Sequence, residues 1–292
     1  MTVTDKIEAR ASEAGADVFL HAVALEGGGE IAVSADESVV LASIFKVAVL
    51  VEVTAQAVGG AFSFTDRVTV HAADRVVGPT GLSVMRDDVE LSLRDLAFLM
   101  MSVSDNTAAD VIIRMVGLDA VNKRLRDLGL AHTELVDDCR GLLGDLAHDL
   151  GIGDGEPLDT SSLTSEQVSQ CRVLRPDETS RSTARETTAL LRAIWRDEAA
   201  PADACAEARR IMRLQVWPHR LRSGFPSNVI VGAKTGTLVV WRNEAGVVTF
   251  PDGAAYAVAV FTRARRADSQ QPAVDRLIGQ AAALAVDALR DR

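Results

Sequence analysis

The chain has few cysteines and no metal-type spacing of ligands. Its three cysteines, Cys139, Cys171 and Cys205, are an odd number without a C-x-x-C pair in a chain of 292 residues. Disulfide frameworks are typical of short secreted chains with paired cysteines, so we expect reduced, buried thiols. The five histidines show no H-x-x-x-H or E-x-x-H arrangement. The sequence therefore predicts no metal site and no cofactor.

Positive charge and long apolar runs are also scarce. The formal net charge is -10 at pH 7 and the pI is about 5.0. Nucleic acids and anionic membranes are bound by concentrated basic faces, and no apolar run reaches membrane-spanning length. The N-terminus lacks the basic start, apolar run and cleavage site of a signal peptide. We expect a cytoplasmic protein with a small-molecule partner, no nucleic acid and no membrane, and leave its oligomeric state open.

Lysine is scarce as well, which makes each lysine informative. The four lysines are Lys6, Lys46, Lys123 and Lys234, whereas arginine supplies the remaining 27 of the 31 basic residues. A GC-rich genome would explain this bias as a whole, but it would not explain where the lysines lie. Lys46 and Lys234 each stand in a short polar motif.

The apolar pattern changes from strand-like to helical and back along the chain. Strand patterns are bounded by turn residues, and helical patterns repeat every three to four residues. Strands are predicted at 17–25, 30–34, 228–231, 244–250 and 256–261. Helices are predicted at 4–14, 43–58, 93–101, 106–115, 120–128, 184–196, 202–214 and 271–289.

This order predicts an α/β (α+β) fold in which an antiparallel sheet is assembled from both chain ends and a helical block is inserted. We expect residues 1–41 and 205–292 to form the sheet domain and residues 42–204 an all-α domain. Periodicity is lost between about 137 and 182, and so long an irregular stretch is usually functional. We therefore expect a loop bordering an active site between the two domains.

A serine and a lysine stand three residues apart at the start of a predicted helix, in Ser43-Ile44-Phe45-Lys46. This spacing brings both side chains to one helix face. A serine hydroxyl becomes a good nucleophile when a neighbour takes its proton, and a partly desolvated lysine has a lowered pKa. The alternative is an N-capping serine with a solvent-facing lysine. The motif therefore needs corroboration.

Corroboration comes from two further motifs in a fixed order. Ser104-Asp105-Asn106 precedes a predicted helix, and Lys234-Thr235-Gly236 is placed at a strand end. With S-x-x-K, these motifs resemble the signature set of class A β-lactamases and penicillin-binding proteins, and the resemblance spans nearly the whole chain. It implies a β-lactamase/transpeptidase-like fold and acyl-enzyme chemistry.

The resemblance implies a role for each motif residue. Ser43 would attack an amide or ester carbonyl, and Lys46 would assist removal of its proton. Ser104 would relay a proton to the leaving nitrogen, Asn106 would orient the substrate amide and Lys46, and Asp105 would brace the turn.

The third motif would bind the substrate. Lys234 would favour a substrate carboxylate, which Thr235 and Thr237 would bind. The N–H groups of Ser43 and Thr237 would form the oxyanion hole, and Gly236 would leave room for substrate along the strand. Arg220, Arg222 and Arg242 flank this segment in sequence; we expect each at a solvated surface, with a carboxylate clamp as the alternative.

One element of the family pattern is missing. Class A β-lactamases carry a glutamate in an E-x-x-L-N loop that activates the water releasing the acyl group, and this motif is absent here. The candidate replacements are Asp137, Asp138, Glu156, Glu166 and Glu178. Without such a base the acyl-enzyme would be long-lived or would pass its acyl group to an amine.

The sequence therefore predicts a serine acyl-enzyme hydrolase acting on a lactam, amide or ester through Ser43. One alternative is an intracellular D-aminopeptidase, amidase, esterase or acyltransferase of biosynthesis with the same chemistry. A second alternative is a non-catalytic β-lactam- or ligand-binding module that keeps the fold.

Overall fold

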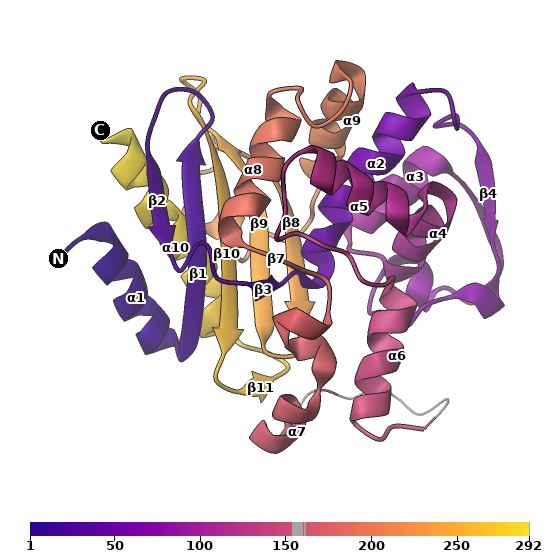
Figure 1. Cartoon of the computed structure of the whole chain (residues 1–292), viewed down its shortest axis with the longest axis horizontal. Coiled ribbons are helices and arrows are strands. Elements are labelled where there is room, and N and C mark those ends of the chain that lie inside the picture. Colours follow the sequence, from indigo (N-terminus) through magenta and orange to yellow (C-terminus); the bar gives the residue numbers. More distant parts are fainter. Residues whose placement is uncertain (154–159, 161, 292) are drawn as a thin grey trace.

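A five-stranded antiparallel sheet, in the order β2-β1-β10-β9-β8, forms the centre of the molecule (Figure 1). The computed structural model describes residues 1–153, 160 and 162–291. Its strands are β1 (Ala16–Ala24), β2 (Glu30–Val33), β3 (Val39–Val40), β4 (Arg67–Val70), β5 (Val89–Ser92), β6 (Ser162–Leu163), β7 (Arg181–Ser182), β8 (Ile230–Leu238), β9 (Trp241–Thr249), β10 (Ala255–Ala264) and β11 (Ala267–Asp268). The predicted sheet from both chain ends is confirmed.

Helices cover both faces of this sheet. They are α1 (Val3–Ala14), α2 (Lys46–Val58), α3 (Leu93–Ser102), α4 (Asn106–Val116), α5 (Leu118–Asp127), α6 (Cys139–Asp149), α7 (Ser165–Gln170), α8 (Ala184–Trp195), α9 (Ala202–Met212) and α10 (Pro272–Arg290). Short 3-10 helices are η1 (Ala42–Phe45), η2 (Ala72–Asp74), η3 (Gly81–Val84), η4 (Arg172–Leu174), η5 (Pro176–Glu178) and η6 (Leu221–Gly224). α1 and α10 pack together on one face, and α8 packs on the other (Figure 1).

Successive side chains of β1 pack into two hydrophobic clusters, one on each face of the sheet. Phe19 belongs to the hydrophobic cluster on the α8 side, whereas Leu20 belongs to the cluster under α1 and α10. Successive side chains of a strand point to opposite faces. Because both faces are covered, both sets are buried, and the strand has a nearly continuous apolar sequence.

The helical block lies beside β8, the edge strand, with α2 at its centre (Figure 1). α2 packs against α3, α4, α5 and α9, and residues 46–55 are all buried. A helix that is apolar on all sides is suited to such a position. η1, which precedes α2, packs against β8 and β9. The start of α2 is thereby placed against the sheet.

The structure corrects three details of the predicted elements. The stretch 137–182, predicted as irregular, contains α6; Gly141 and Gly144 weaken its helical pattern, and Asp138 caps it. The strand predicted at 228–231 is β8, so Lys234 lies inside a strand and not at its end. The helix predicted from Ser43 starts as η1, and α2 begins at Lys46.

The division into two domains stays a prediction, and its boundary at residue 205 falls inside α9. Within the described residues, no helix combines the length and the apolar character that crossing a membrane requires.

Candidate active site

Ser43 lies in η1, in a turn that the sheet holds closely. Ala42 has a φ of 45°, in the left-handed region that side chains other than glycine rarely adopt. The buried Asn243 side chain of β9 donates a hydrogen bond to the carbonyl of Val40, at 2.9 Å. Such strained turns persist where surrounding structure fixes them, and they cluster at functional sites. The serine is therefore held in a defined position at the start of α2.

Gly236 allows β8 to approach this turn. A Cβ atom at this position would lie 3.0 Å from the Leu41 carbonyl oxygen and 3.3 Å from the Ile44 nitrogen. These are backbone atoms, which cannot move aside as a flexible side chain would. The absence of a side chain at Gly236 therefore sets the spacing between β8 and Ser43. The resemblance implied a different role, room for substrate along the strand, which stays a prediction.

Replacing Gly236 with alanine should widen this spacing. We expect the rate of Ser43 acylation to fall by about tenfold or more, because small misplacements in a reacting geometry are costly. The rate is measured by intact mass spectrometry with penicillin G. Gly144→Ala is the matched control, since its Cβ would meet nothing within 4 Å. Equal rates for the two variants would show that the close approach is unimportant.

Lys46 is fully buried and links the first two motifs. Its Nζ donates hydrogen bonds to the carbonyl of Ser104 at 2.7 Å and to Oδ1 of Asn106 at 2.8 Å, with longer contacts to Oγ of Ser104 at 3.4 Å and to the Asp105 carbonyl at 3.5 Å. Burial lowers the pKa of Lys46. The two short bonds match the two hydrogens of a neutral amine, leaving its lone pair free to accept a proton.

Asp105 and Asn106 brace the turn that presents Ser104. Ser104 has a φ of 62°. The Asp105 carboxylate caps α4 by accepting from the Ala108 N–H at 3.0 Å and also accepts from the Leu82 N–H at 2.5 Å. Asn106 donates to the Val77 carbonyl at 2.8 Å, which turns its oxygen towards Lys46. The bracing role predicted for Asp105 fits these contacts.

Lys234 is the second fully buried lysine of the site. Its Nζ donates to the Thr235 carbonyl at 2.8 Å. Burial, together with the positive charge of Lys46 nearby, lowers the pKa of Lys234 well below the usual lysine range. Two cations that share a dry region repel each other, so each favours the neutral form of the other. The structure thus brings the S-x-x-K and K-T-G lysines together.

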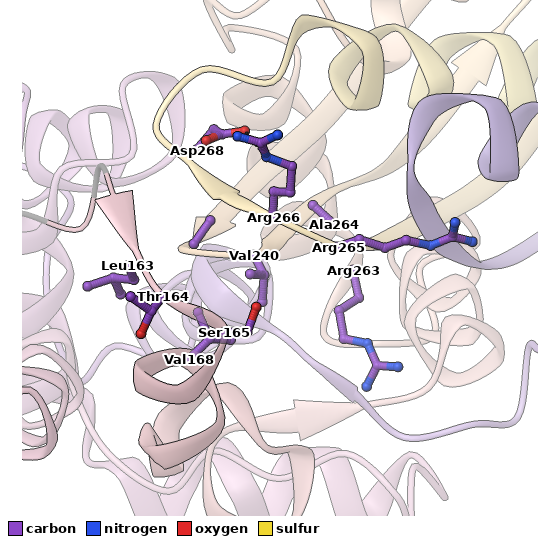
Figure 2. Close-up of a pocket in the computed structure, with 11 residues that line it drawn as sticks. Leu163, Thr164, Ser165, Val168, Val240, Arg263, Ala264, Arg265, Arg266 and Asp268 are labelled. Carbon is purple, nitrogen blue, oxygen red and sulfur yellow. Dashed lines mark ion pairs between the residues drawn. The ribbon is translucent and has the colours of Figure 1, made fainter.

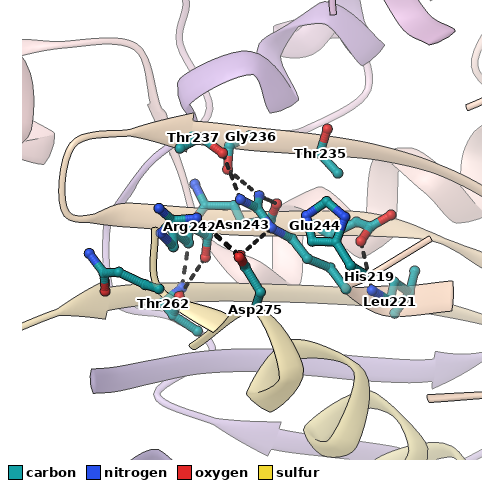
Figure 3. A network of polar contacts seen from close by, with 12 residues as sticks. His219, Leu221, Thr235, Gly236, Thr237, Arg242, Asn243, Glu244, Thr262 and Asp275 are labelled. Atoms are coloured by element: carbon teal, nitrogen blue, oxygen red, sulfur yellow. Dashed lines mark hydrogen bonds and ion pairs between the residues drawn. The ribbon is translucent and has the colours of Figure 1, made fainter. Parts of the chain in front are cut away.

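The expectation that Arg220 and Arg242 are solvated is wrong. Both are buried, and both form ion pairs with Asp275 of α10, at 2.7 Å from Arg220 and 3.2 Å from Arg242 (Figure 3). Arg220 also donates to the Gly236 carbonyl at 2.9 Å and to Oγ1 of Thr237 at 2.8 Å. The carboxylate of Asp275 offsets the cost of burying these cations.

These elements surround one pocket of about 250 Å³. Its lining comprises Ser43, Pro79, Thr80, Val103, Ser104, Asn106, Trp217, His219, Arg220, Thr235 and Thr237. Five of these are residues that the motifs predicted, while Lys46 and Lys234 are buried. The sequence motifs did not predict Trp217 or His219. Burial and the Arg220 cation lower the pKa of the His219 imidazole. Their nearness to Arg220 in sequence was the available signal.

The candidate deacylation bases that the structure describes lie outside this lining. Asp138 caps α6 by accepting from the Gly141 N–H at 2.9 Å, and Asp137 accepts from the Asp138 N–H at 2.7 Å. Glu166 is exposed in the first turn of α7, and Glu178 is exposed in η5. Glu156 lies outside the described residues. Among the described residues that line the Ser43 pocket, none is a carboxylate.

A larger hollow of about 470 Å³ lies between α7 and the end of β10 (Figure 2). Its arginine side chains point in different directions: Arg266 pairs with Asp268 at 3.1 Å, and Arg263 pairs with Asp17 at 3.0 Å. The motif residues do not line it. Size alone therefore does not identify the candidate site.

The comparisons with known proteins agree with this fold. A model of the Beta-lactamase enzyme family matches residues 2–289, and the chain belongs to this family. A relative, the β-lactamase regulatory protein BlaB of Streptomyces cacaoi, is 32% identical over 237 residues, which cover 73% of each chain.

Solved structures show the same fold. A β-lactamase from Sphaerobacter thermophilus is 26% identical with a TM-score of 0.80, covering 99% of this chain and 97% of the other. PBP-A is 20% identical with a TM-score of 0.79, covering 99% and 96%. A class A β-lactamase from Mycobacterium abscessus is 18% identical with a TM-score of 0.80, covering 99% and 100%. The expected β-lactamase/transpeptidase-like fold is confirmed.

Proposed function

We propose that the chain is a serine acyl-enzyme hydrolase or transferase that is acylated efficiently at Ser43 and releases the acyl group slowly. The observation that carries this proposal is the pocket itself. It combines Ser43 and Ser104 with a buried, hydrogen-bonded Lys46, but its described lining includes no carboxylate that could activate water. The site thus contains the groups that acylation needs, whereas its described lining lacks a base for deacylation.

Acylation follows from the positions of the motif residues. Oγ of Ser43 attacks the carbonyl carbon of a lactam, amide or ester while neutral Lys46 takes the hydroxyl proton. The N–H groups of Ser43 and Thr237 stabilise the oxyanion. When the carbonyl–nitrogen bond breaks, Ser104 delivers its hydroxyl proton to the leaving nitrogen and receives from Lys46, whose Nζ lies 3.4 Å from Ser104 Oγ, the proton that came from Ser43. In an ester, the leaving oxygen takes this proton.

The third motif selects the substrate. Arg220 places positive charge beside Thr237, whose hydroxyl oxygen accepts from Arg220 and keeps its hydrogen to donate to a substrate, and Thr235 lines the same pocket. Cations and hydroxyl groups of this kind bind carboxylates. We infer a substrate that carries an acyl group and a carboxylate, such as a penicillin or a peptide ending in a free carboxylate.

Intact mass spectrometry with penicillin G and a cephalosporin tests the proposal. The wild-type protein should gain the mass of one β-lactam, the Ser43→Ala variant should gain none, and the Ser12→Ala variant should behave like the wild type, because Ser12 is exposed on α1. An ester and a D-amino-acid peptide, tested in parallel, distinguish the biosynthetic alternatives. An adduct on Ser43→Ala, or no reaction of the wild type with all four substrates, would refute acylation at Ser43.

A non-catalytic β-lactam-responsive module is the second candidate. Its support is the relative named as a regulatory protein, together with the pocket lining that has no described carboxylate. A module of this kind would keep one acyl group per chain indefinitely, whether or not an acceptor is supplied. An enzyme would lose the adduct when a D-amino acid is added as an amine acceptor.

A further inference from the structure

A buried carboxylate lies behind the pocket, outside the three motifs. Glu244 of β9 is fully buried and pairs in register with Thr235 of β8. One carboxylate oxygen accepts from the Leu221 N–H at 2.6 Å, and the other accepts from Nε2 of Gln215 at 2.5 Å (Figure 3 shows the bond to Leu221). A buried charge is expensive unless it is hydrogen-bonded, so these two bonds define its position.

Gln215 extends this contact to the pocket. Its Oε1 accepts a hydrogen bond from the Thr235 N–H at 2.7 Å. A backbone N–H can only donate, so it fixes the amide oxygen of Gln215 towards Thr235 and the amide nitrogen towards Glu244. Glu244 must then act as an acceptor. In the series of hydrogen bonds from Thr235 through Gln215 to Glu244, each donor therefore points towards Glu244.

The same carboxylate anchors both ends of a pocket wall. The segment 215–221 begins at Gln215 and ends at Leu221, and between them Trp217, His219 and Arg220 line the Ser43 pocket. The free edge of β8, which carries Thr235 and Thr237, is held through the Thr235 N–H. One residue thus connects the wall with the strand that faces it.

We propose that Glu244 is a positioning residue that holds the segment 215–221 and the free edge of β8 in the geometry needed to bind substrate. This inference rests on the proposed function. Glu244 acts through Gln215 and Leu221, and among the described residues its carboxylate forms no hydrogen bond with Ser43 or Lys46. Its loss should therefore weaken substrate binding more than it slows the acylation step.

The charge of Glu244 adds a pH dependence. Burial raises the pKa of Glu244 to about 7, although the Leu221 N–H and the Arg220 cation oppose this shift. A protonated carboxyl loses one acceptor, and its new O–H faces an N–H donor. The wall should loosen as pH falls through this pKa. The charged groups that act on Glu244 are Arg220 and Lys234. Arg220 interacts in turn with Asp275, Arg242 and His219, and Lys234 interacts with Lys46 and Cys139.

The test compares Glu244→Gln with Glu52→Gln. Glu52 of α2 is also a buried glutamate, but it pairs with Arg124 of α5 and does not line the Ser43 pocket. At pH 8, backbone amide hydrogen exchange at Thr235 and in the segment 215–221 should be faster in Glu244→Gln and unchanged in Glu52→Gln. Gln215→Ala breaks the next link at a half-buried position and should give the same exchange pattern. This variant decides the outcome if Glu244→Gln does not fold.

Penicillin G labelling gives the functional readout. The half-saturating concentration should rise about tenfold in Glu244→Gln, the expected cost of one unsatisfied buried donor, while the limiting acylation rate changes by less than about threefold. In the wild type the half-saturating concentration of penicillin G should rise below about pH 7. In Glu244→Gln this rise should be absent. Unchanged exchange, or faster exchange with unchanged half-saturation, overturns the proposal. If the wild type is not labelled, the proposed function fails, and the exchange data still decide whether Glu244 holds the wall.

Discussion

Lys46→Ala should slow the acylation of Ser43 by about 10²- to 10⁴-fold, the usual contribution of a positioned general base. Two hydrogens of the amine are taken by Ser104 and Asn106, and burial favours the neutral form. The measurement is the single-turnover rate with penicillin G. Lys123→Ala is the control, because Lys123 is exposed on α5 and pairs with Asp127. A decrease of less than about tenfold would assign the base to another group.

The pH profile should agree with this role. The pKa of Lys46 is lowered, so the neutral amine becomes populated at a lower pH than for an exposed lysine. The wild-type acylation rate should increase as pH rises through that pKa and level off above it. In Lys46→Ala this rise should disappear. A rise of equal size in both proteins would exclude Lys46 as its source.

Cys139→Glu should shorten the lifetime of the acyl-enzyme by about 10²-fold, the lower range of general-base catalysis. Cys139 is buried at the start of α6, and its sulfur is close enough to interact with the charges of Lys46 and Lys234. Burial raises the pKa of Cys139 to about 12, so the native thiol stays protonated and cannot activate water. A glutamate there would place a carboxylate beside Lys46.

The control for this gain of function is Cys139→Gln, which has the same size without the charge. Both variants overfill a packed position, which costs about 1–3 kcal/mol of stability, so thermal unfolding is measured for both. The adduct lifetime is followed by intact mass after excess penicillin G is removed. Equal lifetimes in the two variants would show that a carboxylate at this position does not restore water activation.

Short-range patterns revealed the centre of the site. Ser43 and Lys46 belong together through helix geometry, and Lys234 is informative because lysine is rare in this chain. The structure brings these residues into one region by the packing of η1 on β8. Spacing and residue type were sufficient here because each motif spans only three or four consecutive residues.

The residues that sequence reasoning missed depend on long-range pairing. Glu244 meets Gln215 only because β8 and β9 pair in one particular register. Arg220 and Arg242 were expected at the surface because their counterion, Asp275, lies on the terminal helix. Nothing local in the sequence indicates these partners.

Helix α6 was also not predicted from the sequence. Two glycines conceal its helical pattern, and without the helix Cys139 could only be interpreted as an inert buried thiol. Its position near Lys46 follows from Asp110, whose carboxylate accepts from the N–H groups of Cys139 at 2.8 Å and Arg140 at 2.9 Å. A buried carboxylate thus fixes the segment where the family motif is missing.

The lifetime of the Ser43 adduct tests the account most directly. The wild-type protein is labelled with penicillin G, freed of excess reagent and weighed intact at intervals. We predict an adduct that persists through many measurements and that is lost faster when an amine acceptor is added. An adduct that disappears within about a second, with multiple turnovers of penicillin G in water, would match ordinary enzyme turnover and contradict slow release.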